Sequence, residues 1–362
     1  RADALLAQMD ERGVEFSAEV YHAAMAATIG GVGGTWGGVN NGAAIVSRDV
    51  LELYGAMQER KIAPNATTFR LCMASLDPVF GFFEKERATE VIEEMEKWYK
   101  ITGDESLRPT VEIYNAALPR HLSRGDIYEK SLMCSKEFLT SPRKHYTTCA
   151  QDMGDWLLYM EKKALEEQNH LIRPNIHTYE PIIRAWVFCG TKECLERAEI
   201  WARRAIEAHR LRLDPSDTSS RPRLTTFQPI VCRLVNLQEA HPHRAEAWIE
   251  TIAALCEEDG GYVGEGPDPL RPDMAMLSAP MLAWKRRANV ADKGEVKEAV
   301  ESSLQKLRTL VQSTREGTVV FSDAAPFLQA AQTVFAMHPD NNDRSYRIEE
   351  ILDLMNTVPD EQ

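Results

Sequence analysis

Cysteine and histidine are the residue types in this sequence that could bind a metal or act as a nucleophile. The chain contains seven cysteines and nine histidines, but it has no CxxC pair and no histidine at zinc-ligand spacing. Cys189 and Cys194 lie five residues apart, which is a poor spacing for a metal or redox pair. His241 and His243 do not belong to an H-E-x-x-H motif. We therefore expect a protein that is not an enzyme and that uses no metal and no cofactor.

The number of cysteines is odd, and they are scattered along the whole chain. This pattern is typical of buried thiols in a reducing compartment rather than of a disulfide framework. The seven positions are Cys72, Cys134, Cys149, Cys189, Cys194, Cys232 and Cys256.

A glycine-rich stretch at residues 28–42, TIGGVGGTWGGVNNG, could in principle cradle a phosphate. Its glycines lack the G-x-G-x-x-G spacing, and no strand precedes them. We interpret the stretch as the connection between two helices.

The amino-acid composition limits the classes of protein to which the chain can belong. The 362 residues are 44% hydrophobic and 27% charged, and the formal net charge is -13 with a pI near 5.3. This acidic balance argues against binding of polyanions through the overall field, although a local basic stripe remains compatible with it. No apolar run approaches the roughly 18 residues that a membrane span needs, so no membrane partner is expected. The length favours several domains or an extended array.

One phrase recurs along the chain and consists of a proline followed five residues later by an aromatic residue or leucine. Two further aromatic residues, Tyr21 and Phe321, extend the series without the proline, and successive anchors are 44 to 65 residues apart. Such self-similarity is the signature of a helical solenoid with insertions. The five complete phrases pair Pro64 with Phe69, Pro109 with Tyr114, Pro174 with Tyr179, Pro222 with Phe227, and Pro272 with Leu277.

The phrase has the chemistry of a helix start. Proline fixes φ and keeps its predecessor extended, so it ends the preceding connection. The next residue is Asn65, Thr110, Asn175 or Asp273 in four of the five phrases. Such side chains can accept hydrogen bonds from the free N–H groups of a first helical turn. The anchor one turn later is expected to point at the partner helix.

Amphipathic segments precede the prolines, so each unit reads as a helix pair. We predict an all-α protein: a right-handed α-solenoid of about seven helix-turn-helix repeats, forming a single array over 1–362. The predicted units are 17–65, 66–110, 111–175, 176–223, 224–273, 274–317 and 318–360, with 1–16 as the tail of a preceding unit. The longest unit is expected to carry an additional helix at 126–141.

The segment LELYGAMQERKIAPNATTF resembles a pentatricopeptide repeat, and ALLAQMDERGVEFSAEVY and IRPNIHTY repeat the likeness. The resemblance is to a divergent member with inserted loops and helices. It implies a protein of organellar gene expression, in a mitochondrion or plastid. It also implies binding of single-stranded RNA on the concave face, at about one base per repeat.

In that family the residue after the aromatic anchor and the residue after the closing proline read the base edge. The resemblance therefore implies seven pairs, of which two match the family's combinations: one suits a pyrimidine and the other suits guanine. An alternative interpretation makes four of the first members, His22, Arg70, Glu180 and Gln228, solvated groups on a helix face. The pairs are His22 with Asn65, Arg70 with Thr110, Asn115 with Asn175 (the pyrimidine pair), Glu180 with Arg223, Gln228 with Asp273, Ser278 with Gly317, and Ser322 with Asp360 (the guanine pair).

The face around these readers has few basic residues and few apolar clamp residues. The position three residues before each reader, where the family has an apolar clamp, is a glutamate at Glu19 and Glu112. Seven residues beyond each reader, Lys285 is the single lysine. Any RNA affinity should then be modest and strongly dependent on salt. The alternative function is a protein-interaction scaffold, or a subunit of a large organellar assembly such as the mitochondrial ribosome.

Overall fold

The computed structural model describes residues 10–13, 15–31, 42–76, 84–118, 144–211, 221–236, 241–258, 270 and 274–287, with isolated helical positions between 294 and 305 and at 349. Within these ranges every regular element is a helix and no strand occurs, which confirms the prediction of an all-α protein. No helix in the described residues combines the length and the apolar character needed to cross a bilayer.

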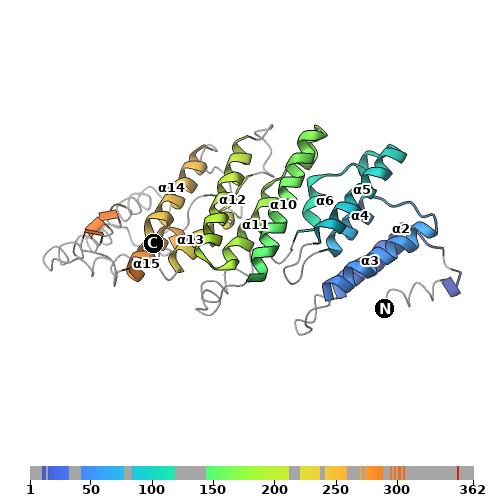
Figure 1. Ribbon diagram of the computed structural model, residues 1–362, viewed down its shortest axis with the longest axis horizontal. Helices are drawn as coiled ribbons and strands as arrows, with labels where there is room; N and C mark the ends of the chain where they lie inside the picture. Colours follow the sequence, from blue (N-terminus) through green and yellow to red (C-terminus); the bar gives the residue numbers. More distant parts are fainter. Residues whose placement is uncertain are drawn as a thin grey trace, which may run out of the picture. The chain divides into compact units, whose positions relative to one another are not determined.

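The described helices divide into two compact bodies. The first body runs from α2 to α12 and the second from α13 to α15 (Figure 1). The first body contains α2 (Ala18–Gly31), α3 (Gly42–Glu59), α4 (Ala66–Ser75), α5 (Lys85–Thr102), η1 (Glu105–Leu107), α6 (Val111–Ala116), α10 (Lys144–Glu166), η2 (His170–Ile172), α11 (Ile176–Cys189) and α12 (Lys192–Arg210). The second body contains α13 (Leu224–Asn236), α14 (Pro242–Glu258) and α15 (Met274–Arg287).

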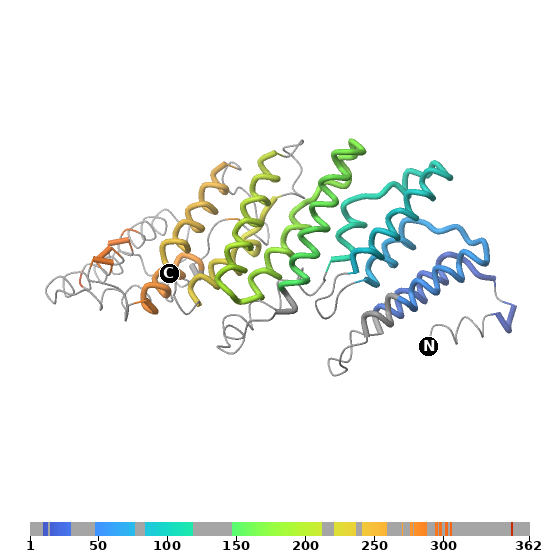
Figure 2. The backbone as a smooth tube through the Cα atoms, in the orientation of Figure 1, coloured from blue at the N-terminus to red at the C-terminus, as the bar shows by residue number. Residues whose placement is uncertain are grey.

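Helices pair in chain order, as Figure 2 shows for α2 beside α3 and for α11 beside α12. We call α2, α4, α6, α11, α13 and α15 first helices, and α3, α5, α10, α12 and α14 second helices. First helices also pack on first helices: α2 on α4, α4 on α6, and α13 on α15. Each of α3, α10 and α14 in addition contacts the first helix that follows it.

The recurring proline marks a helix start in every copy. All five first helices from α4 onward begin two residues after the phrase's proline. Asn65 and Asn175 are N-caps in capping boxes, in which a threonine at the third helical position bonds back to the cap residue. These starts and both asparagine caps confirm the predictions, while Asp273 lies outside the described residues.

The predicted cap at Thr110 is wrong in its mechanism. Thr110 occupies the N-cap position of α6, but its side chain makes no capping hydrogen bond. The N–H of Ile113, which such a cap would serve, donates to the Thr110 backbone carbonyl at 3.0 Å. Ile113 also has no hydroxyl with which to complete a capping box.

Three aromatic anchors pack against the second helix that follows them, as predicted. Tyr179 of α11 lies 6.5 Å from Trp201 of α12, measured between ring centroids. The equivalent contacts join Tyr114 of α6 to Trp156 of α10, at 5.3 Å, and Phe227 of α13 to Trp248 of α14, at 5.7 Å. Phe69 of α4 contacts Tyr54 of the preceding α3 instead. These rings fill the interior between helices and fix the register of each pair.

Two predicted insertions have different outcomes. α2 ends at Gly31 and α3 begins at Gly42, so the glycine-rich stretch does connect two helices, and residues 32–41 lie outside the described part. The helix predicted at 126–141 also lies outside it.

Short extended segments follow the 3₁₀ turns η1 and η2 and lead into the starts of α6 and α11.

Candidate nucleic-acid interface

The predicted pair Asn115 and Asn175 comes together at the junction of α6 and α11. The Asn115 Nδ2 donates to the Asn175 Oδ1 at 3.0 Å. The Asn115 Oδ1 in turn accepts from the hydroxyl of Thr178 at 2.7 Å. Both asparagines are half-buried. The two carboxamides therefore hold each other in fixed orientations, 60 residues apart in the sequence.

The Oδ1 of Asn175 is occupied by capping, so the side-chain NH₂ group is the part of this residue that can bind a ligand. Its Oδ1 accepts from Asn115 and from the His177 backbone N–H, at 3.1 Å for the latter. A carboxamide nitrogen carries two donors. Donors held in place by a helix start can recognise acceptors on the edge of an unstacked base.

The first predicted pair is joined through a bridging threonine. The His22 Nε2 lies 2.8 Å from the Thr68 Oγ1. The same hydroxyl lies 3.3 Å from the Asn65 Oδ1, and the Thr68 N–H donates to that oxygen at 3.2 Å. Burial lowers the pKa of His22 below its ordinary 6.5, more than the charge of Glu19 raises it. His22 is therefore a neutral polar group at pH 7.

Threonine at the third helical position is the residue of this candidate site that the sequence analysis missed. Thr178 bridges Asn175 and Asn115, and Thr68 bridges Asn65 and His22. In the second body Thr226 accepts from the Arg223 N–H at 3.0 Å, so the turn recurs there. The signal was a threonine directly before the aromatic anchor in NATTF, NIHTY and RLTTF.

Glu180 departs from both expectations for it. It is buried inside α11, where its carboxylate lies 3.9 Å from the guanidinium of Arg184 one turn later. Every residue of α11 except His177 is buried. Glu180 is thus neither a solvated group on a helix face nor an accessible base reader.

The remaining candidates are dispersed. Arg70 is exposed on α4, and no hydrogen bond joins it to the half-buried Thr110 within the described residues. Gln228 is half-buried on α13, and Lys285 is exposed in the last turn of α15. Outside the described part lie Asp273, Ser322, Asp360 and the side chain of Ser278.

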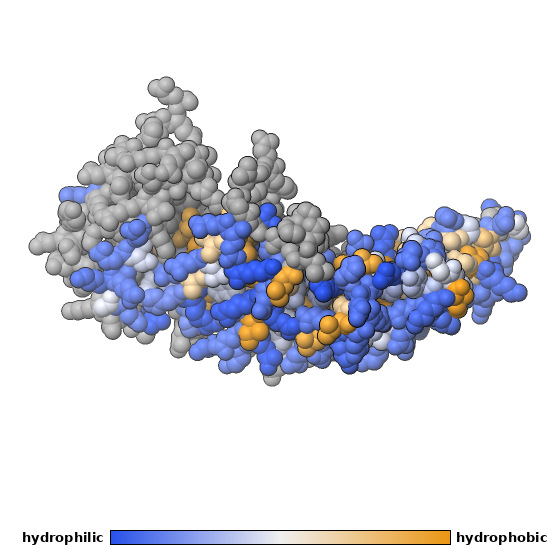
Figure 3. All heavy atoms as spheres, turned by 90° about the horizontal axis from the view of Figure 1, so that it is seen from above, coloured by the Kyte–Doolittle hydropathy of each residue, from blue (hydrophilic) through white to orange (hydrophobic). Residues whose placement is uncertain are grey.

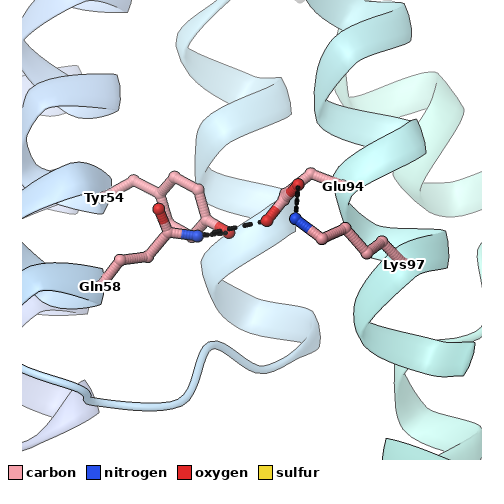
Figure 4. A network of polar contacts seen from close by, with 4 residues as sticks. All are labelled: Tyr54, Gln58, Glu94 and Lys97. Carbon is pink, nitrogen blue, oxygen red and sulfur yellow. Dashed lines mark hydrogen bonds and ion pairs between the residues drawn. The ribbon is translucent and has the colours of Figure 1, made fainter. Parts of the chain in front are cut away.

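The second helices of the first body are joined by ion pairs and charged hydrogen bonds. Figure 4 shows Gln58 and Tyr54 of α3 facing Glu94 and Lys97 of α5, with Gln58 donating to Glu94 at 3.3 Å. An ion pair joins α5 to α10 and another joins α10 to α12. The first helices, by contrast, meet through uncharged side chains at their starts. The two helix layers therefore have different polar chemistry.

The thiols do not form a reactive site in the described part of the chain. Cys189 donates to the Ala185 carbonyl at 3.3 Å and accepts from Thr147 at 3.4 Å. Burial raises the pKa of Cys189 to about 12. Of the cysteines described, Cys232 alone is half-buried and the others are buried, which confirms the prediction of buried thiols for five of them. No three His, Cys, Asp or Glu side chains within the described ranges gather in a metal-binding arrangement.

Alkylation at pH 8 should accordingly spare Cys189 in the folded chain. A pKa four units above the pH leaves about one thiol in ten thousand as the reactive thiolate. Peptide mapping after brief treatment with iodoacetamide would measure the labelled fraction at Cys189 and Cys232, with the denatured chain as the fully labelled reference. Equal labelling of the two cysteines in the folded chain would contradict the buried position of Cys189.

No protein-family model matches this sequence, and no curated protein matches it either. The resemblance to pentatricopeptide repeats rests on the repeated phrase, together with the helix starts that the phrase marks.

Proposed function

We propose that this chain is a pentatricopeptide-repeat-like protein that binds single-stranded RNA and performs no chemistry of its own. In this proposal the helix pairs continue into a right-handed α-solenoid of about seven repeats, whose first helices line the concave RNA-binding face. The packing of first helix on first helix, and of second helix on the next first helix, supports a repetitive array. The family resemblance is the ground for placing the protein in mitochondrial or plastid RNA processing, stability or translation.

The observation that carries the proposal is the hydrogen bond between Asn115 and Asn175. The residues were paired from a sequence resemblance alone, at a separation of 60 positions, and they lie in contact. Their carboxamides are oriented by Thr178 and by the start of α11, so a base would meet donors that need little reorganisation. The unpaired bases of a single strand expose the edges that such donors can recognise.

RNA selection by the purified chain tests this proposal directly. A random single-stranded pool at about 100 mM salt should yield ligands with a pyrimidine enriched at one fixed position. Asn115→Ala should abolish that enrichment and weaken binding about 5- to 30-fold, which corresponds to the roughly 1–2 kcal/mol of a base contact. Asn175 keeps its bond to the His177 N–H in this variant, so α11 retains its cap.

Asn236→Ala is the matched control for that variant. Asn236 ends α13 and bonds to the Cys232 carbonyl within its own helix, so its loss should change neither affinity nor base preference. Absence of any RNA binding by the wild-type chain, at concentrations up to about 100 μM, would refute the proposed function.

A protein-interaction scaffold is the second candidate, and exposed apolar side chains on second helices favour it. Leu165 and Leu211, at the ends of α10 and α12, are 79% and 71% exposed. Leu158 and Ile200 are exposed in the middle of the same two helices. Hydrophilic residues otherwise predominate on the face drawn in Figure 3, where apolar residues form small groups. Leu158→Glu with Ile200→Glu should impair assembly into a larger organellar complex and leave RNA binding unchanged.

A further inference from the structure

Several arginines of the first body are engaged by carboxylates of the chain. The pairs are Arg48 with Glu52, Arg87 with Glu84 and Arg204 with Glu161 on second helices, and Arg184 with Glu180 on the first helix α11. Arg70, Arg108 and Arg173 have no ion-pair partner within the part of the chain that the structure describes. All three belong to first helices or to the connections that lead into them. Their guanidinium groups are therefore available to an external anion.

Arg108 and Arg173 occupy the same position in two copies of one turn. In each copy the side chain of a capping Asp or Asn accepts a hydrogen bond from the backbone N–H two residues later. The last residue of the 3₁₀ turn is aliphatic and buried, and the backbone N–H of the arginine closes the turn. The arginine backbone is extended in both, with φ near -70 and -62 and ψ of 123 and 133. The copies consist of Asp104, Leu107, Arg108 and Pro109, and of Asn169, Ile172, Arg173 and Pro174.

This turn places Arg173 next to the polar contacts at the start of α11, and it places Arg108 two residues before the N-cap of α6, at the same position. Arg173 precedes Asn175 by two residues, a distance of about 7 Å along an extended chain. Arg70 sits on α4 directly after the anchor Phe69, as Asn115 follows Tyr114 on α6. Arg173 and Arg70 are exposed and Arg108 is half-buried.

A phosphate group is the anion that fits this arrangement. Guanidinium groups bind phosphate through paired hydrogen bonds as well as charge, and they do so wherever no carboxylate competes. The chain's net charge of -13 repels RNA at long range. Backbone contacts must then come from cations that the chain does not neutralise itself.

We propose that Arg70, Arg108 and Arg173 form a phosphate-binding row that holds the backbone of a single-stranded RNA beside the Asn115 and Asn175 pair. This inference rests on the proposed RNA-binding function and adds residues to it: Arg108 and Arg173 had no assigned role, and Arg70 binds phosphate rather than a base edge.

The test compares two triple variants of the full chain, using the RNA ligands selected by the wild type. Arg70→Gln, Arg108→Gln and Arg173→Gln together should weaken binding at least about tenfold. They should also lower the slope of log affinity against log salt by about 2, since each phosphate contact on a single strand contributes about 0.7. The base preference should be unchanged, because phosphate contacts carry no sequence information.

The control variant combines Arg48→Gln, Arg87→Gln and Lys97→Gln, which removes the same charge from second helices, where these side chains are 63%, 43% and 64% exposed. It should keep the wild-type salt slope. If both triple variants lost RNA affinity equally, the loss would be a general effect of charge, and the proposed phosphate-binding row would be wrong. Unchanged binding in the first variant would overturn the row and leave the proposed function standing. Absence of RNA binding by the wild type would refute both. Circular dichroism and gel filtration would establish that each variant is folded.

Discussion

Trp156→Ala is expected to lower the free energy of unfolding by about 3–5 kcal/mol, the usual cost of removing a fully buried large aromatic side chain. Trp156 of α10 is completely inaccessible to solvent. Its ring centroid lies 5.3 Å from that of Tyr114 and also 5.3 Å from that of Tyr159. Its Nε1 donates to the Tyr114 backbone carbonyl at 3.4 Å, so truncation would also leave a buried acceptor without this donor. Denaturant titration followed by circular dichroism measures the loss.

Leu158→Ala supplies the matched control on the same helix. Leu158 is 44% exposed, so its truncation should cost less than about 1 kcal/mol. A loss below that value for Trp156→Ala would contradict the packing of α6 on α10. Since Asn115 directly follows Tyr114, Trp156→Ala should also weaken any base preference that depends on Asn115, whereas Leu158→Ala should not.

Local signals explain why the helix starts could be predicted from sequence. A proline, a capping side chain and an aromatic anchor act within six residues, and their conformational effects need no knowledge of distant contacts. All five helices that begin after Pro64, Pro109, Pro174, Pro222 and Pro272 do so at the same offset. The anchors Tyr179 and Phe227 were correctly expected to face a partner helix, because an apolar ring one turn into a helix must be buried by a neighbour.

Long-range packing decided what the sequence could not predict. Glu180 reads as a surface position from its neighbours, yet α11 is buried almost throughout its length, because α10 and α12 both pack on it. The bridging threonines depend on contacts 46 and 63 residues away, to His22 and Asn115. Thr110 makes no side-chain cap, and Ile113 at the third position of α6 has no hydroxyl to bond back to the cap residue, as Thr68 and Thr178 do in α4 and α11. Helix propensity and residue spacing carry no information about these long-range partners.

A second large effect is expected at the ion pair between α5 and α10. Lys163→Met should destabilise the fold by about 3 kcal/mol, since it leaves the Glu96 carboxylate without its partner in a poorly solvated position. The side chains of Lys163 and Glu96 are only 11% and 17% exposed. Lys163 also donates to the Tyr159 hydroxyl at 3.4 Å, so its loss disturbs the aromatic cluster around Trp156.

The pH dependence of this pair has a definite sign. Burial by itself would lower the pKa of Lys163, but the hydrogen bond and charge of Glu96, with Tyr159 and Glu167, raise the pKa above its ordinary 10.5. A lysine with a raised folded-state pKa stabilises the fold fully below its unfolded pKa, and this contribution disappears as the pH rises through the folded value. The wild type should therefore lose stability relative to Lys163→Met only above about pH 10.5, and the difference should be constant from pH 6 to 9.

The double variant Glu96→Gln with Lys163→Met separates the pair's attraction from the cost of an unpaired charge. Because desolvation opposes the attraction of a buried pair, removing both charges should restore most of the stability that Lys163→Met loses. Lys162→Met is the control: the neighbouring lysine is 73% exposed and pairs with an exposed Glu166, so its loss should change the free energy of unfolding by less than about 0.5 kcal/mol. A double variant as unstable as Lys163→Met alone would mean that the lysine acts through its contact with Tyr159 and not through Glu96. A double-mutant cycle at pH 7 would decide between these two outcomes.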